Sequence, residues 1–409
     1  MNQFQLRREA VANTIDVYGC FISIANDNIV KSADSFFPFE VNKNFYYLTG
    51  IEQDSSVLLI VKSEASTKEY IFIKDIDPML EKWVGTFLTI EQAKTVSGCV
   101  TILPLSALQS TLNRLMVRTP VKLLYLDHHK NRLDSQELAM DRFLKTYFTH
   151  FSIPWVMHHH VIHHMRMIKS DVEVAAIRAA IEVSKRAFEH LLTVKSTLKH
   201  EHEIQAHLEF IFKMNQAKPG FDTIVAAHKR ATILHYVENN KQIEEDALIL
   251  IDMGSQLNHY SSDISRTIPF KDTFSEIQKK AMQVVLDGME VVFKLCKPGI
   301  PMKELHSSLI EFYKERLVTD GFISNPDEVS RVFYHGVGHF LGLDIHDVGQ
   351  YDDVVLQKGH VITVEPGLYI EELNVGVRIE DNILITEDGY ENLSLGIIKS
   401  VEDIEQFLQ

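Results

Sequence analysis

The first 155 residues alternate short apolar runs with polar, helix-forming stretches. Strands are predicted where apolar residues run without interruption between polar turns, at Val57–Val61, Tyr70–Ile73 and Leu123–Leu126. Helices are predicted between them, over residues 91–95 and 107–116. Because alternating strands and helices pack into layers, we predict an α/β domain over residues 1–155.

Beyond residue 170 the pattern predicts longer helices. Ser170 and Glu173 form a capping box, and the helix that they open has apolar residues on one face, at Val174, Ile177, Ile181, Phe188 and Leu191. Further helices are predicted over residues 201–215, 275–295 and 302–317, and strands over residues 247–252, 260–268, 361–364 and 375–386. We predict that residues 170–409 form a second domain.

A histidine-rich stretch lies between the two halves. It carries His158, His159, His160, His163 and His164. Neighbouring residues on a strand point to opposite faces, so this spacing fixes no metal-binding geometry. We therefore interpret the stretch as a solvated strand within a linker over residues 156–169, with a metal site as the less favoured alternative.

Composition narrows the class of protein. The formal net charge of −15 disfavours binding to nucleic acid, which needs a basic surface, and to anionic membranes. No apolar run approaches the roughly 20 residues of a membrane span, and the N-terminus has no apolar signal core. Three widely separated cysteines encode no disulfide framework. These features predict a soluble cytoplasmic protein.

Carboxylates stand at the ends of the apolar strands of the second half. Asp252 ends the run Ala247–Ile251, and Asp263 lies on the returning strand. If the hairpin turns at Leu257–Asn258, the two aspartates are cross-strand neighbours with Cβ atoms about 5 Å apart. Like charges so placed destabilise a sheet, which favours a cation between them over a pair of surface acids.

Two further segments carry groups of the same kind. In His335-Gly336-Val337-Gly338-His339 the glycines let the backbone bend so that both imidazoles can reach one site, and His346 follows seven residues later. Glu365 ends the apolar strand 361–364, while Arg378 and Glu380 lie on one face of the last strand.

Four carboxylates and one imidazole in a core would repel one another unless cations joined them. Oxygen ligands favour hard divalent ions. We therefore predict a site for two metal ions, Mn²⁺ above Co²⁺, Zn²⁺ or Fe²⁺, held by Asp252, Asp263, His339, Glu365 and Glu380.

These motifs resemble the pita-bread metallopeptidases, the group of methionine aminopeptidase, aminopeptidase P and prolidase. The resemblance covers about residues 165–405 and is carried by Ile251–Gly254, Asp263–Thr267, His335–His339, Thr363–Gly367 and Val377–Asp381. Residues 45–50, Phe-Tyr-Tyr-Leu-Thr-Gly, resemble the N-terminal domain of aminopeptidase P. The resemblance implies an α+β pita-bread catalytic domain with a curved, mainly antiparallel sheet.

It also implies roles for individual residues. Asp263 and Glu380 match bridging carboxylates, Asp252 matches a ligand of one metal, and His339 and Glu365 match ligands of the other. His235 and His346 match histidines on the substrate side, His335 one on the proline side, and Arg378 an arginine that orients ligands.

The activity that the resemblance implies is removal of an N-terminal residue that precedes proline. A hydroxide shared by two metals would attack the carbonyl before proline, and Glu365 would carry the proton to the leaving nitrogen. The expected partners are peptides with proline in second position, and a homodimer or homotetramer is expected. Two alternatives stay open: an Xaa-Pro dipeptidase (prolidase), and a pita-bread binding module without catalysis.

Overall fold

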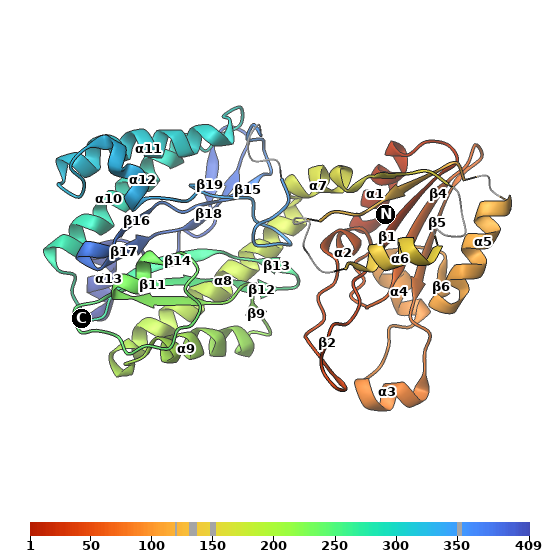
Figure 1. Ribbon diagram of the computed structural model, residues 1–409, viewed down its shortest axis with the longest axis horizontal. Helices are drawn as coiled ribbons and strands as arrows, with labels where there is room; N and C mark the ends of the chain where they lie inside the picture. Colours follow the sequence, from red (N-terminus) through yellow and green to blue (C-terminus); the bar gives the residue numbers. More distant parts are fainter. Residues whose placement is uncertain (119–120, 131–136, 148–152, 350–353) are drawn as a thin grey trace. The chain divides into compact units, whose positions relative to one another are not determined.

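The structure is a computed structural model that describes residues 1–118, 121–130, 137–147, 153–349 and 354–409 (Figure 1). The chain forms two compact units, Met1–Arg166 and Met167–Gln409. Within the described residues, no helix combines the length and the apolarity that crossing a bilayer requires.

The first unit is built on a six-stranded mixed sheet in the order β6-β5-β4-β1-β7-β8. Its strands are β1 (Gly19–Ile24), β4 (Val57–Lys62), β5 (Thr67–Ile73), β6 (Ile102–Pro104), β7 (Leu123–Leu126) and β8 (Trp155–Met157). Strands β1, β7 and β8 run parallel, whereas β4 is antiparallel to both β1 and β5. A separate hairpin joins β2 (Val30–Ser32) and β3 (Ser35–Phe36).

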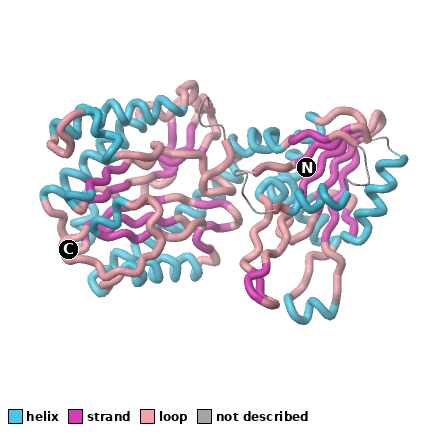
Figure 2. Tube along the Cα trace, in the orientation of Figure 1, coloured by secondary structure: helices cyan, strands magenta, loops and turns pink. Residues whose placement is uncertain are grey.

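Helices accompany this sheet (Figure 2). They are α1 (Gln3–Thr14), α2 (Lys43–Thr49), α3 (Pro78–Val84), α4 (Ile90–Ser97), α5 (Leu108–Arg118), α6 (Ala139–Tyr147) and α7 (His159–Met167). The core joins side chains of the central strands, such as Ile22, Leu59 and Phe72, to Leu112 of α5. The predicted α/β layers, strands and helices of this unit are confirmed.

In the second unit, strands lie between two groups of helices (Figure 1). The helices are α8 (Asp171–Val194), α9 (Glu201–Met214), α10 (Glu276–Phe293), α11 (Met302–Thr319), α12 (Val329–Val332) and α13 (Val401–Leu408). The capping box predicted at Ser170 is present, and the predicted apolar face of α8 is buried.

The strands of this unit form several small antiparallel sheets. One has the order β10-β11-β14, with β10 (Ile224–Ala227), β11 (Leu248–Met253) and β14 (Ile264–Pro269). A second consists of β15 (Val361–Val364), β18 (Asp381–Ile385) and β19 (Tyr390–Asn392). Shorter pairings join β9 (Lys218–Pro219), β12 (Ser255–Leu257) and β13 (Tyr260–Ser261), and β16 (Gly367–Ile370) with β17 (Val375–Arg378).

Three details differ from the sequence prediction. The continuous strands predicted over 260–268 and 375–386 are each interrupted, leaving Asp263 and Glu380 in the breaks. The histidine-rich stretch is helix α7 after a three-residue strand, so its interpretation as a solvated strand is wrong. The hairpin after Asp252 turns at Asn258–His259, one residue later than predicted.

Candidate metal centre

Asp252 and Asp263 come from one hairpin. Asp252 lies opposite Ser265 in the β11–β14 ladder, so Asp263 is its diagonal neighbour and the predicted direct pairing is wrong. Asn258 and His259 at the turn have positive φ angles of 50° and 71°, as tight hairpin turns require. Because this turn sets the register, the two carboxylates still share one face.

Asp263 is held at its main chain by Asn382 of β18. Its N–H donates to Asn382 Oδ1 over 3.2 Å, and Asn382 Nδ2 donates to the Asp263 carbonyl over 2.6 Å. Asn382 is fully buried. A rigid amide contact of this kind fixes the break that precedes β14, and so fixes where the Asp263 carboxylate points.

His339 and Glu365 are positioned together by a backbone ladder. Thr363 N–H donates to the His339 carbonyl over 2.8 Å, and Glu365 N–H donates to the Val337 carbonyl over 2.9 Å. The two segments approach so closely that a Cβ on Gly338 would lie 2.0 Å from the Thr363 carbonyl oxygen. Gly338 is therefore required for the approach that sets His339 beside Glu365.

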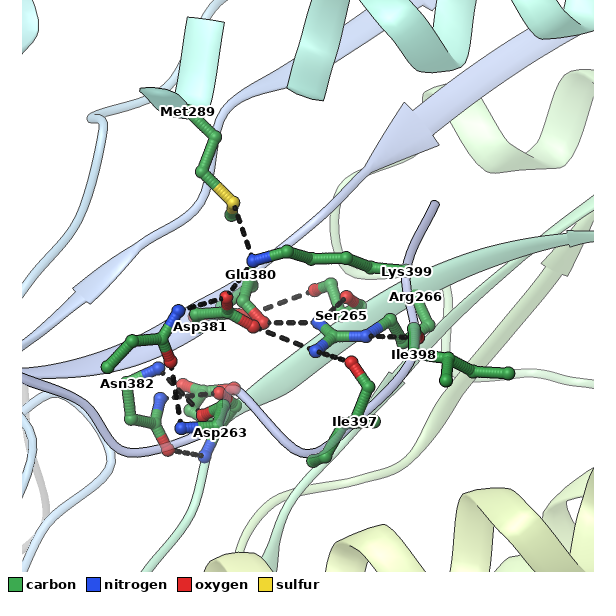
Figure 3. Close-up of polar contacts among 12 residues, drawn as sticks. Asp263, Ser265, Arg266, Met289, Glu380, Asp381, Asn382, Ile397, Ile398 and Lys399 are labelled. Atoms are coloured by element: carbon green, nitrogen blue, oxygen red, sulfur yellow. Dashed lines mark hydrogen bonds and ion pairs between the residues drawn. The ribbon is translucent and has the colours of Figure 1, made fainter. Parts of the chain in front are cut away.

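Glu380 occupies the break between β17 and β18. Ser265 Oγ donates to Glu380 Oε2 over 2.9 Å, and Glu380 N–H donates to the Ser265 carbonyl over 3.1 Å. On the other face of β14, the buried Arg266 donates to the Glu380 carbonyl over 2.6 Å and to Asp381 Oδ1 over 2.7 Å (Figure 3). Glu380 is thus fixed at both its side chain and its backbone.

A network around Asp381 supports this break. Asp381 also pairs with Lys399 (Figure 3). In addition, it accepts a hydrogen bond from Asn392 Nδ2. Burial alone would raise the pKa of Asp381, but the charges of Arg266 and Lys399 hold it below its ordinary value. The negative charge of Asp381 is therefore neutralised by neighbouring cations, whereas that of Glu380 is not.

The candidate ligand groups converge. One ligand atom each of Asp263, His339 and Glu380 lies within 4.8 Å of the other two. His339 Nε2 is 3.4 Å from Asp263 Oδ2 and 3.6 Å from Glu365 Oε1. Asp252 joins the group through Arg378, whose Nη2 donates to Asp252 Oδ2 over 2.8 Å. The structure thus brings together all five residues that the sequence predicted as metal ligands.

Three carboxylates of this group, those of Asp263, Glu365 and Glu380, resist ionisation. Burial, with repulsion from Asp252, raises the pKa of Asp263 to about 6 despite the neighbouring His339. Burial likewise raises the pKa of Glu365 to about 7, and burial with three neighbouring carboxylates raises that of Glu380 well above its ordinary value. Burial would lower the pKa of His339, but Asp263 and Glu365 raise it to about 9. The single charge of His339 is therefore too little to balance four carboxylates, and the group needs further positive charge before all of them can ionise.

Divalent cations would supply that charge. Oδ1 of Asp252 and Oε1 of Glu380 are buried and accept no hydrogen bond from the residues that the structure describes. Buried polar atoms are rarely left without a partner, and both belong to the predicted ligand set. A set of four carboxylates and one imidazole fits hard or borderline divalent ions.

Three accessory histidines surround the group. The His346 ring centroid lies 4.3 Å from that of His339, and His335 Nε2 lies 2.8 Å from the Tyr369 hydroxyl. Burial lowers the pKa of His335 to about 3 and that of His346 to about 4, and the charge of His235 contributes to both shifts. Both imidazoles are therefore neutral at pH 7. His235 is exposed, and it lies close enough to His335 and His346 to affect the pKa of both.

Arg378 and Tyr369 form a buried link that sequence reasoning found only in part. Arg378 Nη1 lies 3.2 Å from the Tyr369 hydroxyl, and Nε donates to Ser265 Oγ over 2.8 Å. Arg378 was predicted as an orienting residue, whereas Tyr369 and Ser265 were given no role. Tyr369 lies two residues after Gly367 on β16, and Gly367 pairs with Arg378 on β17. Because alternate residues of a strand share a face, this spacing is the signal that could have placed Tyr369 on the same face as Arg378.

Comparison with known proteins identifies the family. The profile of metallopeptidase family M24 matches residues 175–387, and that of the aminopeptidase P N-terminal domain matches residues 4–125. Xaa-Pro aminopeptidase of Escherichia coli is 30% identical over 434 aligned positions, covering 99% of this chain and 97% of that protein. Xaa-Pro dipeptidase of Pyrococcus furiosus is 40% identical over 238, covering 57% of this chain and 65% of that protein.

Solved structures agree over the whole chain. Aminopeptidase P from E. coli, solved with the inhibitor Pro-Leu, has a TM-score of 0.89 at 29% identity and covers 99% of this chain and 97% of that one. A Bacillus anthracis relative has a TM-score of 0.95 at 38% identity, with the same coverage. The predicted pita-bread fold after an α/β domain is confirmed. The chain therefore belongs to metallopeptidase family M24, a family that depends on two metal ions, and is a metal-dependent exopeptidase.

Proposed function

We propose that this exopeptidase hydrolyses the bond between an N-terminal residue and a proline in second position. The observation that carries the proposal is the convergence of Asp263, His339 and Glu380, joined by Glu365 and Asp252. Two of these carboxylates have a buried oxygen without a hydrogen-bond partner among the described residues, and the chain matches an Xaa-Pro aminopeptidase over nearly its full length. Because prolyl nitrogen carries no hydrogen, the ring and the carbonyl of the substrate must be recognised instead.

In this proposal two divalent ions would be held by Asp252, Asp263, His339, Glu365 and Glu380. The ions would supply Lewis acidity and an activated water near neutral pH. Mn²⁺ is the proposed metal, because the set offers mainly oxygen ligands; Co²⁺, Zn²⁺ and Fe²⁺ are also compatible with it. Arg378 would fix the orientation of Asp252 through the contact at 2.8 Å.

Glu365 is the proposed proton carrier. Its carboxylate lies beside His339, with Oε1 3.6 Å from His339 Nε2, where it could take a proton from the attacking water and return it to the leaving nitrogen. His346 and His235, on the open side of the site, would donate hydrogen bonds to the oxygen of the scissile carbonyl. His335, held by Tyr369, would line the wall that contacts the proline ring.

We further propose that the protein acts as a homodimer or homotetramer in the cytoplasm. Support for assembly comes from α3, where Trp83 is 84% exposed, Met79 63% and Val84 59%. Exposed apolar clusters mark interaction surfaces. Support for the compartment comes from three buried cysteines that form no disulfide.

The experiment is a peptide panel with and without added Mn²⁺, read by release of the N-terminal amino acid. Xaa-Pro-Xaa tripeptides and longer peptides should be cleaved after the first residue, and removal of metal should abolish the activity. Cleavage confined to Xaa-Pro dipeptides would show a prolidase instead. Absence of both cleavage and bound metal would show a binding module.

A further inference from the structure

A second group of side chains that can ligate a metal, all of them histidines, belongs to the N-terminal unit, whereas the carboxylate centre belongs to the other unit. Strands β7 and β8 are parallel neighbours, paired from Leu124 with Trp155 to Leu126 with Met157. Each is followed by histidines, His128 and His129 after β7 and His158 onwards after β8. Because parallel strands end at one edge of a sheet, histidines about 30 residues apart in sequence meet there.

Helix α7 arranges the second set. It begins at His159, so His159 and His163 are four residues apart on one face of the helix. Their ring centroids are 5.0 Å apart. The strand assumed from sequence would have pointed successive histidines to opposite faces, which is why this pairing was not foreseen.

His129 completes a triangle of imidazoles. Its ring centroid is 4.6 Å from that of His159 and 5.3 Å from that of His163. Imidazoles that bind one tetrahedral ion with metal–nitrogen distances of about 2.0–2.1 Å have centroids about 5 Å apart. The three ring centroids therefore have the spacing expected for ligands of one ion.

Two neighbouring histidines, His158 and His128, make contacts with other residues. His158 Nε2 lies 2.8 Å from Thr14 Oγ1 and its ring packs at 4.8 Å on Tyr125, while His128 Nε2 lies 3.0 Å from Asp141. In contrast, Nδ1 of His159 is buried and has no hydrogen-bond partner among the described residues. Burial and the charge of His129 lower the pKa of His159, which keeps the imidazole in the neutral form that binds metal.

We propose that His129, His159 and His163 form a separate metal site that binds Zn²⁺ or a similar borderline ion such as Ni²⁺ or Cu²⁺. Three nitrogen ligands and no carboxylate give a preference opposite to that of the catalytic centre, since Mn²⁺ favours oxygen. An ion bound here joins the end of β7 to helix α7, and so ties two segments of the N-terminal unit together.

The first test uses the tag-free, full-length chain carrying Asp263→Asn and His339→Ala, which disable the carboxylate centre. Equilibrium dialysis should find about one bound Zn²⁺ per chain and no bound Mn²⁺. Adding His159→Gln and His163→Gln should weaken Zn²⁺ binding by about 100-fold or more. Adding His160→Gln and His164→Gln, two exposed residues with the same spacing on the same helix, should change it by less than about 3-fold.

Loss of binding in both variants to the same extent would overturn the proposal, as would the absence of bound Zn²⁺ in the parent. A second measurement needs no variant. In the wild-type chain, Zn²⁺ should protect His159 and His163 from acylation by diethylpyrocarbonate, mapped by mass spectrometry, whereas Mn²⁺ should not. Equal modification with and without Zn²⁺ would contradict the site.

Discussion

Arg378 Nη2 lies 2.8 Å from Asp252 Oδ2, and both side chains are buried. The same guanidinium donates to Ser265, whose hydroxyl in turn donates to Glu380. One side chain therefore connects two candidate ligands that come from strands far apart in the sequence. This link explains how the hairpin and the last strands of the unit are kept in one arrangement.

Replacing Arg378 by Lys keeps the charge but removes the planar fork that reaches Asp252, Ser265 and Tyr369 together. We expect kcat to fall by about 10–100-fold, as when groups that orient metal ligands are lost. The measurement is steady-state kinetics alongside metal content. Arg331→Lys is the control, because its pair with Glu372 is exposed at both ends. Equal kcat in the two variants would contradict the orienting role.

Replacing Glu365 by Gln keeps the size of the side chain but removes the carboxyl group that can take up and release a proton. If Glu365 is the proton carrier, kcat should fall by at least about 10²–10⁴-fold, while thermal unfolding stays cooperative. The comparison is Glu371→Gln, an exposed glutamate six residues later. A Glu365→Gln variant that retained wild-type kcat with bound metal would remove Glu365 from the mechanism.

Metal binding should release protons. The pKa values of Asp263, Glu365 and His339 are raised to about 6, 7 and 9, so the metal-free folded chain holds protons that the unfolded chain has lost. The stability that these groups add is present at low pH and declines as pH rises through those values. Because metal displaces the protons, its affinity should rise with pH.

Isothermal titration of the metal-free protein with Mn²⁺ at pH 6.5, in two buffers of different ionisation enthalpy, measures this release directly. We expect about two to three protons per chain, because Glu380, whose pKa is also raised well above its ordinary value, adds to the three groups named above. A binding heat that is the same in both buffers would show that the ligands are already deprotonated, and would contradict the assignment of these residues to the metal centre.

Glu201 should control the segment that carries His235. It is fully buried, and its carboxylate accepts hydrogen bonds from Ala227 N–H, Arg230, Tyr236 and Lys241 N–H at 2.7–3.1 Å. Glu201→Gln should lower the free energy of unfolding by about 1–3 kcal/mol and raise KM. Glu244, the other carboxylate that pairs with Arg230, is 39% exposed, so Glu244→Gln should cost at most about 1 kcal/mol. Urea denaturation measures the free energy of unfolding of both variants, and steady-state kinetics measures their KM.

Much of this site was predictable because its chemistry follows the order of the sequence. Asp252 and Glu365 lie at the ends of apolar strands, where a carboxylate in a core needs a cation. The pattern of apolar residues alone therefore predicted both as metal ligands. The register of the hairpin was not predictable, because the turn depends on which residues adopt positive φ, and Asn258 and His259 do so. The contact of Tyr369 with His335 joins residues 34 positions apart, and no local pattern encodes such a distance.

The secondary structure of the histidine-rich stretch was predicted wrongly for a different reason. Seven of the nine residues of α7, His159–Met167, are histidine, methionine or arginine. Methionine and arginine favour helix, whereas histidine, Val161 and Ile162 favour it less, so composition alone does not decide between helix and strand. The choice between helix and strand depends on how the segment after β8 packs. There the ring of His158 packs against Tyr125, and its Nε2 lies at hydrogen-bond distance from the Thr14 hydroxyl. Tertiary packing therefore selects the helix that local propensity leaves open.

The last prediction concerns a buried ion pair behind His346. Lys169 Nζ lies 3.0 Å from Asp347 Oδ2, and each side chain is 1% exposed. The Asp347 N–H donates to the Phe340 carbonyl over 2.8 Å, which closes the loop that presents His346. The pair leaves so little room that a Cβ on Gly342 would lie 2.3 Å from Asp347 Oδ2.

Lys169→Met should therefore destabilise the fold by about 3–5 kcal/mol, because it leaves the Asp347 carboxylate buried without its ammonium partner. Asp347→Leu should do the same from the other side, whereas the double variant should recover part of the loss, since an apolar pair of similar volume removes both charges at once. Urea denaturation of the two single variants and the double variant gives the coupling energy. Because the loop carries His346, kcat/KM should fall in Lys169→Met even at temperatures where the variant remains folded. Additive losses of stability, with kcat/KM unchanged, would mean that the pair neither balances charge nor positions the loop.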